Sequence, residues 1–150
     1  MIDINIRKRL EGAEGNFCLE VNQSIEKGQL ITLYGNSGAG KTSLLRILAG
    51  LMVPESGEIS VDGQVWFNAE KGIQLKPGKR STAMVFQDYA LFPNMTVRKN
   101  LLYALKDKQD VQLVDQLMEV VELQHLQDRK PGTLSGGQRQ RVGLARALSC

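Results

Sequence analysis

A short glycine-rich stretch carries the clearest chemistry in the sequence. It is GNSGAGKT at Gly35–Thr42, and it fits the pattern G-x-x-x-x-G-K-[ST], which is typical of loops that hold nucleotide phosphates. Glycines let such a loop turn tightly and direct several backbone N–H groups inward at phosphate oxygens. The Lys41 ammonium can reach the β- and γ-phosphates, and the Thr42 hydroxyl can ligate Mg²⁺. The stretch therefore predicts a site for a nucleotide triphosphate.

The segments on either side of this loop fit the same interpretation. Residues 29–35, QLITLYG, predict a strand buried on both faces, and residues 41–52, KTSLLRILAGLM, predict a helix with an apolar face. The loop would deliver phosphate to a helix N-terminus, which favours anions. An ordinary glycine turn is the alternative. In this context we favour the phosphate site, with the residues Gly35, Asn36, Ser37, Gly38, Ala39, Gly40, Lys41, Thr42 and Ser43.

Periodicity predicts the remaining elements. Alternating residues 2–6 and 17–21 and the run at 81–87 predict strands, and GEISVDGQVWF at 57–67 predicts a hairpin turning at Asp62-Gly63. The segments 96–106 and 110–126 and the end of the chain predict helices, the last capped by Ser135. The predicted apolar faces are Leu44, Leu45, Leu48 and Leu51 in the first helix, and Val111, Val114, Leu117, Met118 and Val121 in the third.

The phosphate pattern alone indicates only a P-loop NTPase, a class that includes kinases, GTPases, helicases and transport ATPases. LSGGQRQR at Leu134–Arg141 resembles the signature motif of ATP-binding cassette (ABC) ATPases, and VFQDYALFP at Val85–Pro93 resembles their Q-loop. The three motifs stand in the family's order, and the resemblance covers essentially all 150 residues. Within the family, the sequence is similar to ATPases of bacterial importers of the molybdate and sulfate type.

The resemblance implies an α/β fold: a P-loop NTPase core with an antiparallel β part, a helical insert and a mixed sheet. It divides the chain into a β part with the P-loop core (1–87), a helical insert (88–134) and a signature helix (135–150). We expect the chain to stop before the Walker B strand, whose Asp-Glu pair the family uses for Mg²⁺ and water. We therefore expect very weak ATP hydrolysis by this chain alone, and self-association or rearrangement to cover its apolar surface.

The resemblance also implies how the site works. Two such domains pair head to tail, so that Ser135, Gly136, Gly137 and Gln138 would serve an ATP held mainly by the partner. Ser-Gly-Gly as a simple capped helix start is the alternative. Gln87 would act as a sensor of Mg²⁺ or the attacking water. Lys41 and Gln87 are then the catalytic residues, and Thr42 and Gln87 the metal-binding residues, with ATP and Mg²⁺ as cofactors.

Four other side chains have competing interpretations. The family stacks an aromatic residue on adenine, but we interpret Phe17 as a core residue because it alternates with Leu19 and Val21. Tyr89 and Phe92 could dock a permease helix or pack within the helical insert. The family's functional histidine follows the signature, so that role does not transfer to His125, for which we expect a solvated or capping role.

Composition sets limits on function. The hydrophobic fraction of 42%, the charged fraction of 23% and the absence of a long apolar run indicate a globular chain that spans no membrane. A net charge of +3 does not argue for nucleic acid as a partner, and we interpret the basic segment KPGKR as a solvated turn. The two cysteines, Cys18 and Cys150, are interpreted as reduced thiols.

Together these features predict the ATP-binding subunit of an ABC importer, which couples ATP binding and hydrolysis to uptake of a solute. We expect this solute to be an oxyanion such as molybdate. Its partners would be a second ATPase subunit and membrane permease subunits. It would lie peripherally on the cytoplasmic face of the inner membrane. The alternatives are a non-transport ABC ATPase of DNA repair or translation, and a nucleotide-binding fragment without turnover.

Overall fold

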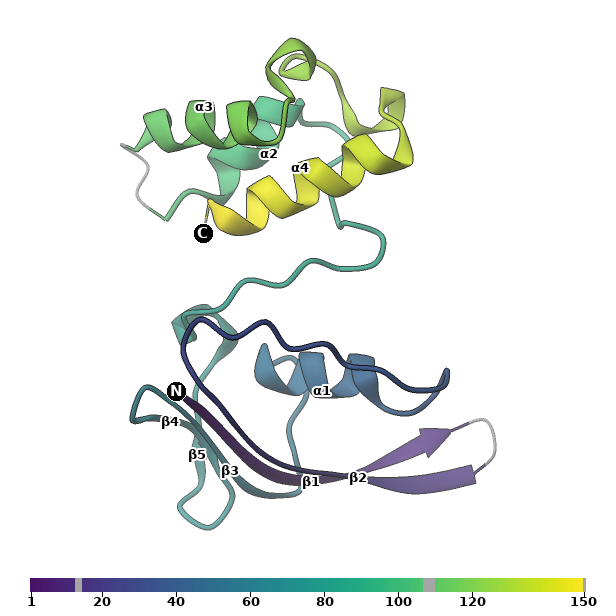
Figure 1. Cartoon of the computed structure of the whole chain (residues 1–150), viewed down its shortest axis with the longest axis vertical. Coiled ribbons are helices and arrows are strands. Elements are labelled where there is room, and N and C mark those ends of the chain that lie inside the picture. The colour runs from purple at the N-terminus through teal and green to yellow at the C-terminus, as the bar shows by residue number, and fades with distance from the viewer. Residues whose placement is uncertain (13–14, 107–109, 150) are drawn as a thin grey trace. The chain divides into compact units, whose positions relative to one another are not determined.

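The computed structural model describes residues 1–12, 15–106 and 110–149. The chain divides into two compact units, Met1–Thr82 and Ala83–Cys150, and each unit has its own hydrophobic core. Figure 1 shows a twisted sheet covered by a helix in the first unit and a group of helices in the second.

An antiparallel sheet with the strand order β2-β1-β3-β4-β5 forms the base of the first unit. The alternation predicted at residues 2–6 and 17–21 is confirmed, and the strands it belongs to are longer than predicted. Ile4 and Ile6 point from β1 into the core, because successive strand residues face opposite sides of a sheet. The five strands are β1 (Ile2–Gly12), β2 (Gly15–Ile25), β3 (Ser56–Val61), β4 (Gln64–Asn68) and β5 (Ile73–Gln74).

The predicted hairpin is present between β3 and β4. Its two-residue turn is Asp62-Gly63, with φ angles of 48° and 80°, the left-handed conformation that a tight hairpin turn requires at both positions. Glycine adopts this conformation without strain, and aspartate tolerates it.

Helix α1 (Lys41–Leu48) covers one face of the sheet (Figure 1). Leu44 and Ile47 pack from it into the same core as the isoleucines of β1 and β3. The predicted face was partly wrong, since Leu45 and Leu51 are 47% and 52% exposed. The helix stops at Leu48, before Leu51 could join its face, because the chain turns at Gly50 with φ 78°.

Two predicted strands do not form. Residues 29–35 have no strand structure, and Leu30 and Tyr34 are 94% and 99% exposed. The segment 81–87 is likewise without a strand. A strand needs a neighbour for its N–H and C=O groups, and none of the described residues pairs with either segment. Every strand pair of the described residues is antiparallel, so the predicted mixed sheet is wrong for this part of the chain.

The second unit consists of helices that pack around an apolar core. The predicted helices at 96–106, at 110–126 and at the end of the chain are confirmed, with shorter bounds: α2 (Val97–Ala104), α3 (Val111–Val120) and α4 (Gly136–Leu148). Val114 and Met118 of the predicted stripe are buried, whereas Val111 is 38% exposed. The core residues are Val97, Leu101, Leu105, Val114, Met118, Leu123, Leu126, Leu134, Val142 and Ala145.

Helices α2 and α3 are linked by an exposed ion pair between Arg98 and Asp115. The hydrogen bond from Arg98 holds the pKa of the Asp115 carboxyl below its ordinary value of 3.8. A lowered pKa means that the unfolded chain binds the proton more tightly. The pair therefore stabilises the fold above about pH 4, and this stability is lost as the pH falls through the folded-state pKa.

The variant Asp115→Asn tests this pair. We expect it to lower the urea midpoint slightly, by an amount that is constant between about pH 5 and pH 7 and shrinks below about pH 4, where the wild-type carboxyl takes up its proton. Urea unfolding followed by circular dichroism at several pH values measures the difference. A difference that stays constant into the acid range would show that the charge of Asp115 contributes nothing.

Candidate nucleotide site

The glycine-rich loop wraps around the side chain of its own lysine. The Lys41 Nζ donates hydrogen bonds of 2.7 Å to the carbonyl oxygens of Gly35 and Asn36. The Ala39 N–H donates to the Asn36 carbonyl at 3.2 Å, which closes a turn within the loop. The ammonium is therefore held on the inner side of the loop, where a phosphate tail would need a positive charge.

Apolar side chains of β1 and β2 also pack against the loop at Gly40. Gly40 has φ 86°, and a Cβ at this position would lie 3.3 Å from side-chain atoms of Leu10 and Leu19. Phe17 comes within 3.6 Å of the same point and is half-buried. Phe17 belongs to neither hydrophobic core of the described residues, so the core position expected for it is not confirmed, and its ring lies beside the loop instead. A side chain at Gly40 would thus meet both backbone strain and crowding.

Helix α1 begins directly at the lysine of the loop. Gly40 is its N-cap and supplies no capping side chain, and its first turn has no acidic residue. Helix geometry leaves the N–H groups of Lys41, Thr42 and Ser43 without intrahelical acceptors, and the helix dipole is positive at this end. Anion binding at the start of α1 is therefore electrostatically favoured.

A divalent cation at this loop would be ligated by a side-chain hydroxyl and by phosphate oxygens of the nucleotide. In the described part of the chain, no cluster of three or more His, Cys, Asp or Glu side chains could hold a metal ion. The Thr42 side chain is exposed in the first turn of α1, beside the lysine. This donor set fits Mg²⁺, which keeps several waters and binds mainly through phosphate oxygens with few protein ligands.

The other predicted site residues lie in the second unit. Gln87 is exposed and begins a turn that continues through Tyr89 and Ala90, which have φ angles of 60° and 43°. Arg146 of α4 donates hydrogen bonds to the carbonyls of both. The guanidinium also lies 5.5 Å from the ring centre of Phe92. The turn after Gln87 is therefore tied to α4.

The predicted signature residues form the start of α4. Ser135 and Gln138 make a reciprocal capping box: the Ser135 Oγ accepts from the Gln138 N–H, and the Gln138 Oε1 accepts from the Ser135 N–H. Gly136 and Gly137 are exposed, and a Cβ on either would meet open space. Among the described residues, no contact requires glycine at either position.

His125 lies exposed in the short 3-10 helix η2 (Gln124–Leu126) of the second unit. This placement agrees with the solvated role expected for it.

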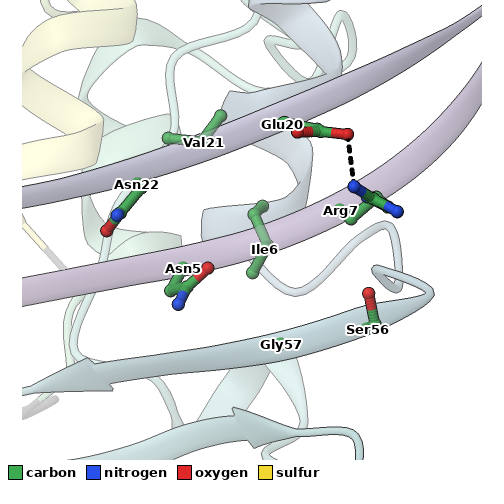
Figure 2. A pocket seen from close by; sticks show the side chains of 8 residues that line it. All are labelled: Asn5, Ile6, Arg7, Glu20, Val21, Asn22, Ser56 and Gly57. Carbon is green, nitrogen blue, oxygen red and sulfur yellow. Dashed lines mark ion pairs between the residues drawn. The ribbon is translucent and has the colours of Figure 1, made fainter.

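A shallow cavity of about 380 Å³ lies on the sheet, and no predicted site residue lines it. Figure 2 shows the Arg7 and Glu20 side chains pointing toward each other there, as an ion pair of 2.7 Å. Gly57 of β3 contributes no side chain to this surface.

Sequence reasoning missed three polar side chains that organise these segments. Arg80 was placed in a solvated turn, but it is only 7% exposed. Asn100 of α2 is fully buried and exchanges hydrogen bonds with the backbone of Phe92, and Arg146 holds the turn after Gln87. Their partners are backbone carbonyls and N–H groups, which carry no sequence signal.

Comparison with known protein families shows which family the chain belongs to. A family model described as ABC transporter matches residues 18–150, which is most of the chain. The chain belongs to the ABC transporter family. Its fold is the P-loop fold of ABC ATPases, with an antiparallel β region and helices, in a form that is partial relative to complete cassettes.

Two relatives of this ABC chain are the molybdenum import ATP-binding proteins ModC of Paramagnetospirillum magneticum and of Escherichia coli. They are 42% and 43% identical over 151 and 148 residues, which cover 99% of this chain. The chain spans about two fifths of their length, 40% and 41% respectively.

Of the helices in the described ranges, none is both long and apolar enough to cross a bilayer.

Solved structures of the ATP-binding cassette MJ0796 share the fold. One is a dimer in a post-hydrolysis state bound to ADP and phosphate, with a TM-score of 0.79, 26% identity, and coverage of 99% of this chain and 69% of that one. A second dimeric structure, described as a bacterial ABC transporter cassette, has a TM-score of 0.75 and 28% identity, with the same coverage.

Proposed function

We propose that this ABC chain binds the triphosphate of Mg-ATP at Gly35–Ser43 as the nucleotide-binding part of an importer ATPase. The observation that carries the proposal is the Lys41 ammonium, held 2.7 Å from two loop carbonyls at the start of α1. A cation, a tight glycine bend and a helix N-terminus converge there, and each favours the same polyanion. Hydrolysis and its coupling to uptake are proposed for the full-length protein.

Each site residue has a proposed role. Lys41 neutralises the β- and γ-phosphates, and Thr42 ligates Mg²⁺ through its exposed hydroxyl. Gln87 contacts Mg²⁺ or the attacking water and passes movement to the helical insert. The proposed division is a nucleotide-binding core over 1–87, a helical insert over 88–134 and a signature helix over 135–150.

The second ATPase subunit is proposed to complete the site. Ser135, Gly136, Gly137 and Gln138 would face the ATP of a partner in a head-to-tail dimer. The MJ0796 cassettes are dimers, which supports the pairing of two such chains. The start of α4 also suits an anion, because its exposed glycines allow close approach to backbone N–H groups at the positive end of a helix dipole.

The proposed solute is an oxyanion, and molybdate is the first candidate because the ModC relatives are described as molybdenum import ATP-binding proteins. A permease would supply the membrane path, so the chain would lie peripherally on the cytoplasmic face of the inner membrane. Phe92 is 37% exposed and packs edge-on against Tyr103 at 4.7 Å, which gives the second unit an aromatic surface for a permease segment.

Calorimetric titration with Mg-ATP tests the nucleotide site, and sedimentation with and without ATP tests the dimer. We expect saturable ATP binding by the wild type and ATP-dependent association. The variant Gly137→Ala should still bind ATP but associate at least about tenfold more weakly, because a methyl group would stand between the backbone N–H groups and the partner's phosphate.

The stability of the same variant is the control. Gly137 is helical and its surroundings are open, so alanine should leave the urea midpoint unchanged or raise the stability by about 0.5 kcal/mol. Absence of ATP binding by the wild type would refute the nucleotide site. Equal association of wild type and Gly137→Ala would refute the role of the signature.

A further inference from the structure

Arg80 is a charged side chain that the protein buries and that the proposed function does not use. Only 7% of the residue is exposed. Its Nη1 donates hydrogen bonds of 2.8 Å to the carbonyls of Ile47 and Leu48, and its Nε donates one of 3.0 Å to the carbonyl of Leu75. Two of these three acceptors belong to the last turn of α1.

The surroundings of Arg80 are shaped to hold a guanidinium. Its Cζ lies 5.5 Å from the ring centre of the buried Trp66, a distance typical of cation–π contacts. A Cβ at Gly50 would lie 2.8 Å from the Nε, so only glycine leaves the side chain its present space. Burial lowers the pKa of Arg80, yet a guanidinium stays charged at neutral pH. The negative end of the α1 dipole compensates that charge.

The opposite end of α1 carries the phosphate loop. A helix of eight residues is about 12 Å long and behaves as a single rigid rod. Tilting its C-terminal end therefore moves the N–H groups and the lysine at its N-terminal end. Phosphate recognition is sensitive to such shifts, since a misplacement of about 1 Å can cost on the order of a hundredfold in function.

We propose that Arg80 is a positioning residue for the phosphate loop: by tying the last carbonyls of α1 to Leu75 and Trp66, it fixes the helix whose start holds the nucleotide. The inference rests on the proposed function, because it assigns Arg80 to the same site. Arg80 acts through α1 and touches no nucleotide. Since a guanidinium has several donors in a fixed fork, lysine can replace its charge but not its full set of hydrogen bonds.

The test compares Arg80→Met and Arg80→Lys with the matched control Arg46→Met. Arg46 is an exposed arginine in the last turn of the same helix. At a temperature where circular dichroism shows all variants folded, we expect the dissociation constant for Mg-ATP to rise about tenfold or more in Arg80→Met, to rise less in Arg80→Lys, and to stay within about twofold of wild type in Arg46→Met.

Hydrogen exchange supplies a readout that a general loss of stability would not produce. The Leu44 amide donates to the Gly40 carbonyl at 2.9 Å, next to the phosphate loop. We expect its exchange to accelerate in the Arg80 variants more than exchange at the buried Ile59 of β3. Equal acceleration at both amides would overturn the inference, because it would mean that Arg80 stabilises the unit as a whole.

The remaining outcomes are also decisive. Wild-type affinity in folded Arg80→Met, or an equal loss of affinity in Arg46→Met, would overturn the inference. If Arg80→Met does not fold, Arg80→Lys decides by the same two measurements. If the wild type itself binds no ATP, the proposed function fails, and the exchange of Leu44 relative to Ile59 alone supports or overturns the role of Arg80.

Discussion

Replacement of Lys41 by alanine is expected to abolish measurable binding of Mg-ATP. The ammonium is the positive charge that the loop holds at its centre, 2.7 Å from the carbonyls of Gly35 and Asn36. Charge-assisted hydrogen bonds contribute about 1.5–3 kcal/mol each, so losing contacts to two phosphates should weaken binding by at least about a hundredfold. Isothermal titration calorimetry with Mg-ATP measures the effect.

Two further variants test whether the charge of Lys41 itself causes the loss of affinity. Lys41→Met keeps most of the side-chain length without the ammonium, and it should lose as much affinity as alanine. Lys71→Ala removes an exposed lysine from the turn between β4 and β5 and should bind as the wild type does. Unchanged affinity in Lys41→Ala would remove this lysine from the site and leave the proposed function without its main support.

The largest expected loss of stability follows from the substitution Gly57→Ala. Gly57 lies in β3 with φ 99°, and a Cβ there would lie 1.9 Å from the Asn5 carbonyl oxygen of β1. The obstacle is backbone in the middle of a paired strand, so it cannot rotate away as a side chain would. Steric overlap and left-handed strain together should cost about 3 kcal/mol or more, a large share of the stability of a small domain.

Gly63→Ala is the matched control for this prediction. Gly63 has a similar φ of 80°, but a Cβ there meets no atom within 4 Å. Its substitution carries only the left-handed strain of about 1–2 kcal/mol. Urea unfolding of both variants, followed by circular dichroism, isolates the contact with β1. Equal losses in the two variants would mean that the sheet relaxes around the extra methyl group.

Local sequence determined much of the candidate site. The glycine-rich loop at Gly35–Thr42 and the capping box at Ser135 are each encoded within a few consecutive residues, because glycine conformations and short-range hydrogen bonds are local properties. The hairpin turn at Asp62-Gly63 is equally local, and it forms as predicted. The apolar stripe with Val114 and Met118 was readable for a related reason, since helical period alone sets which residues share a face.

Tertiary structure decided the rest. The β-forming composition of 29–35 could not make a strand, because strand structure depends on hydrogen bonds to a neighbour that the described chain does not provide. Arg80 looked like a solvated cation in a basic turn, yet carbonyls 32 and 33 residues earlier in the chain draw it into the interior. Strand pairing and side-chain burial depend on contacts between segments that are distant in the sequence, and a local sequence pattern does not encode those contacts.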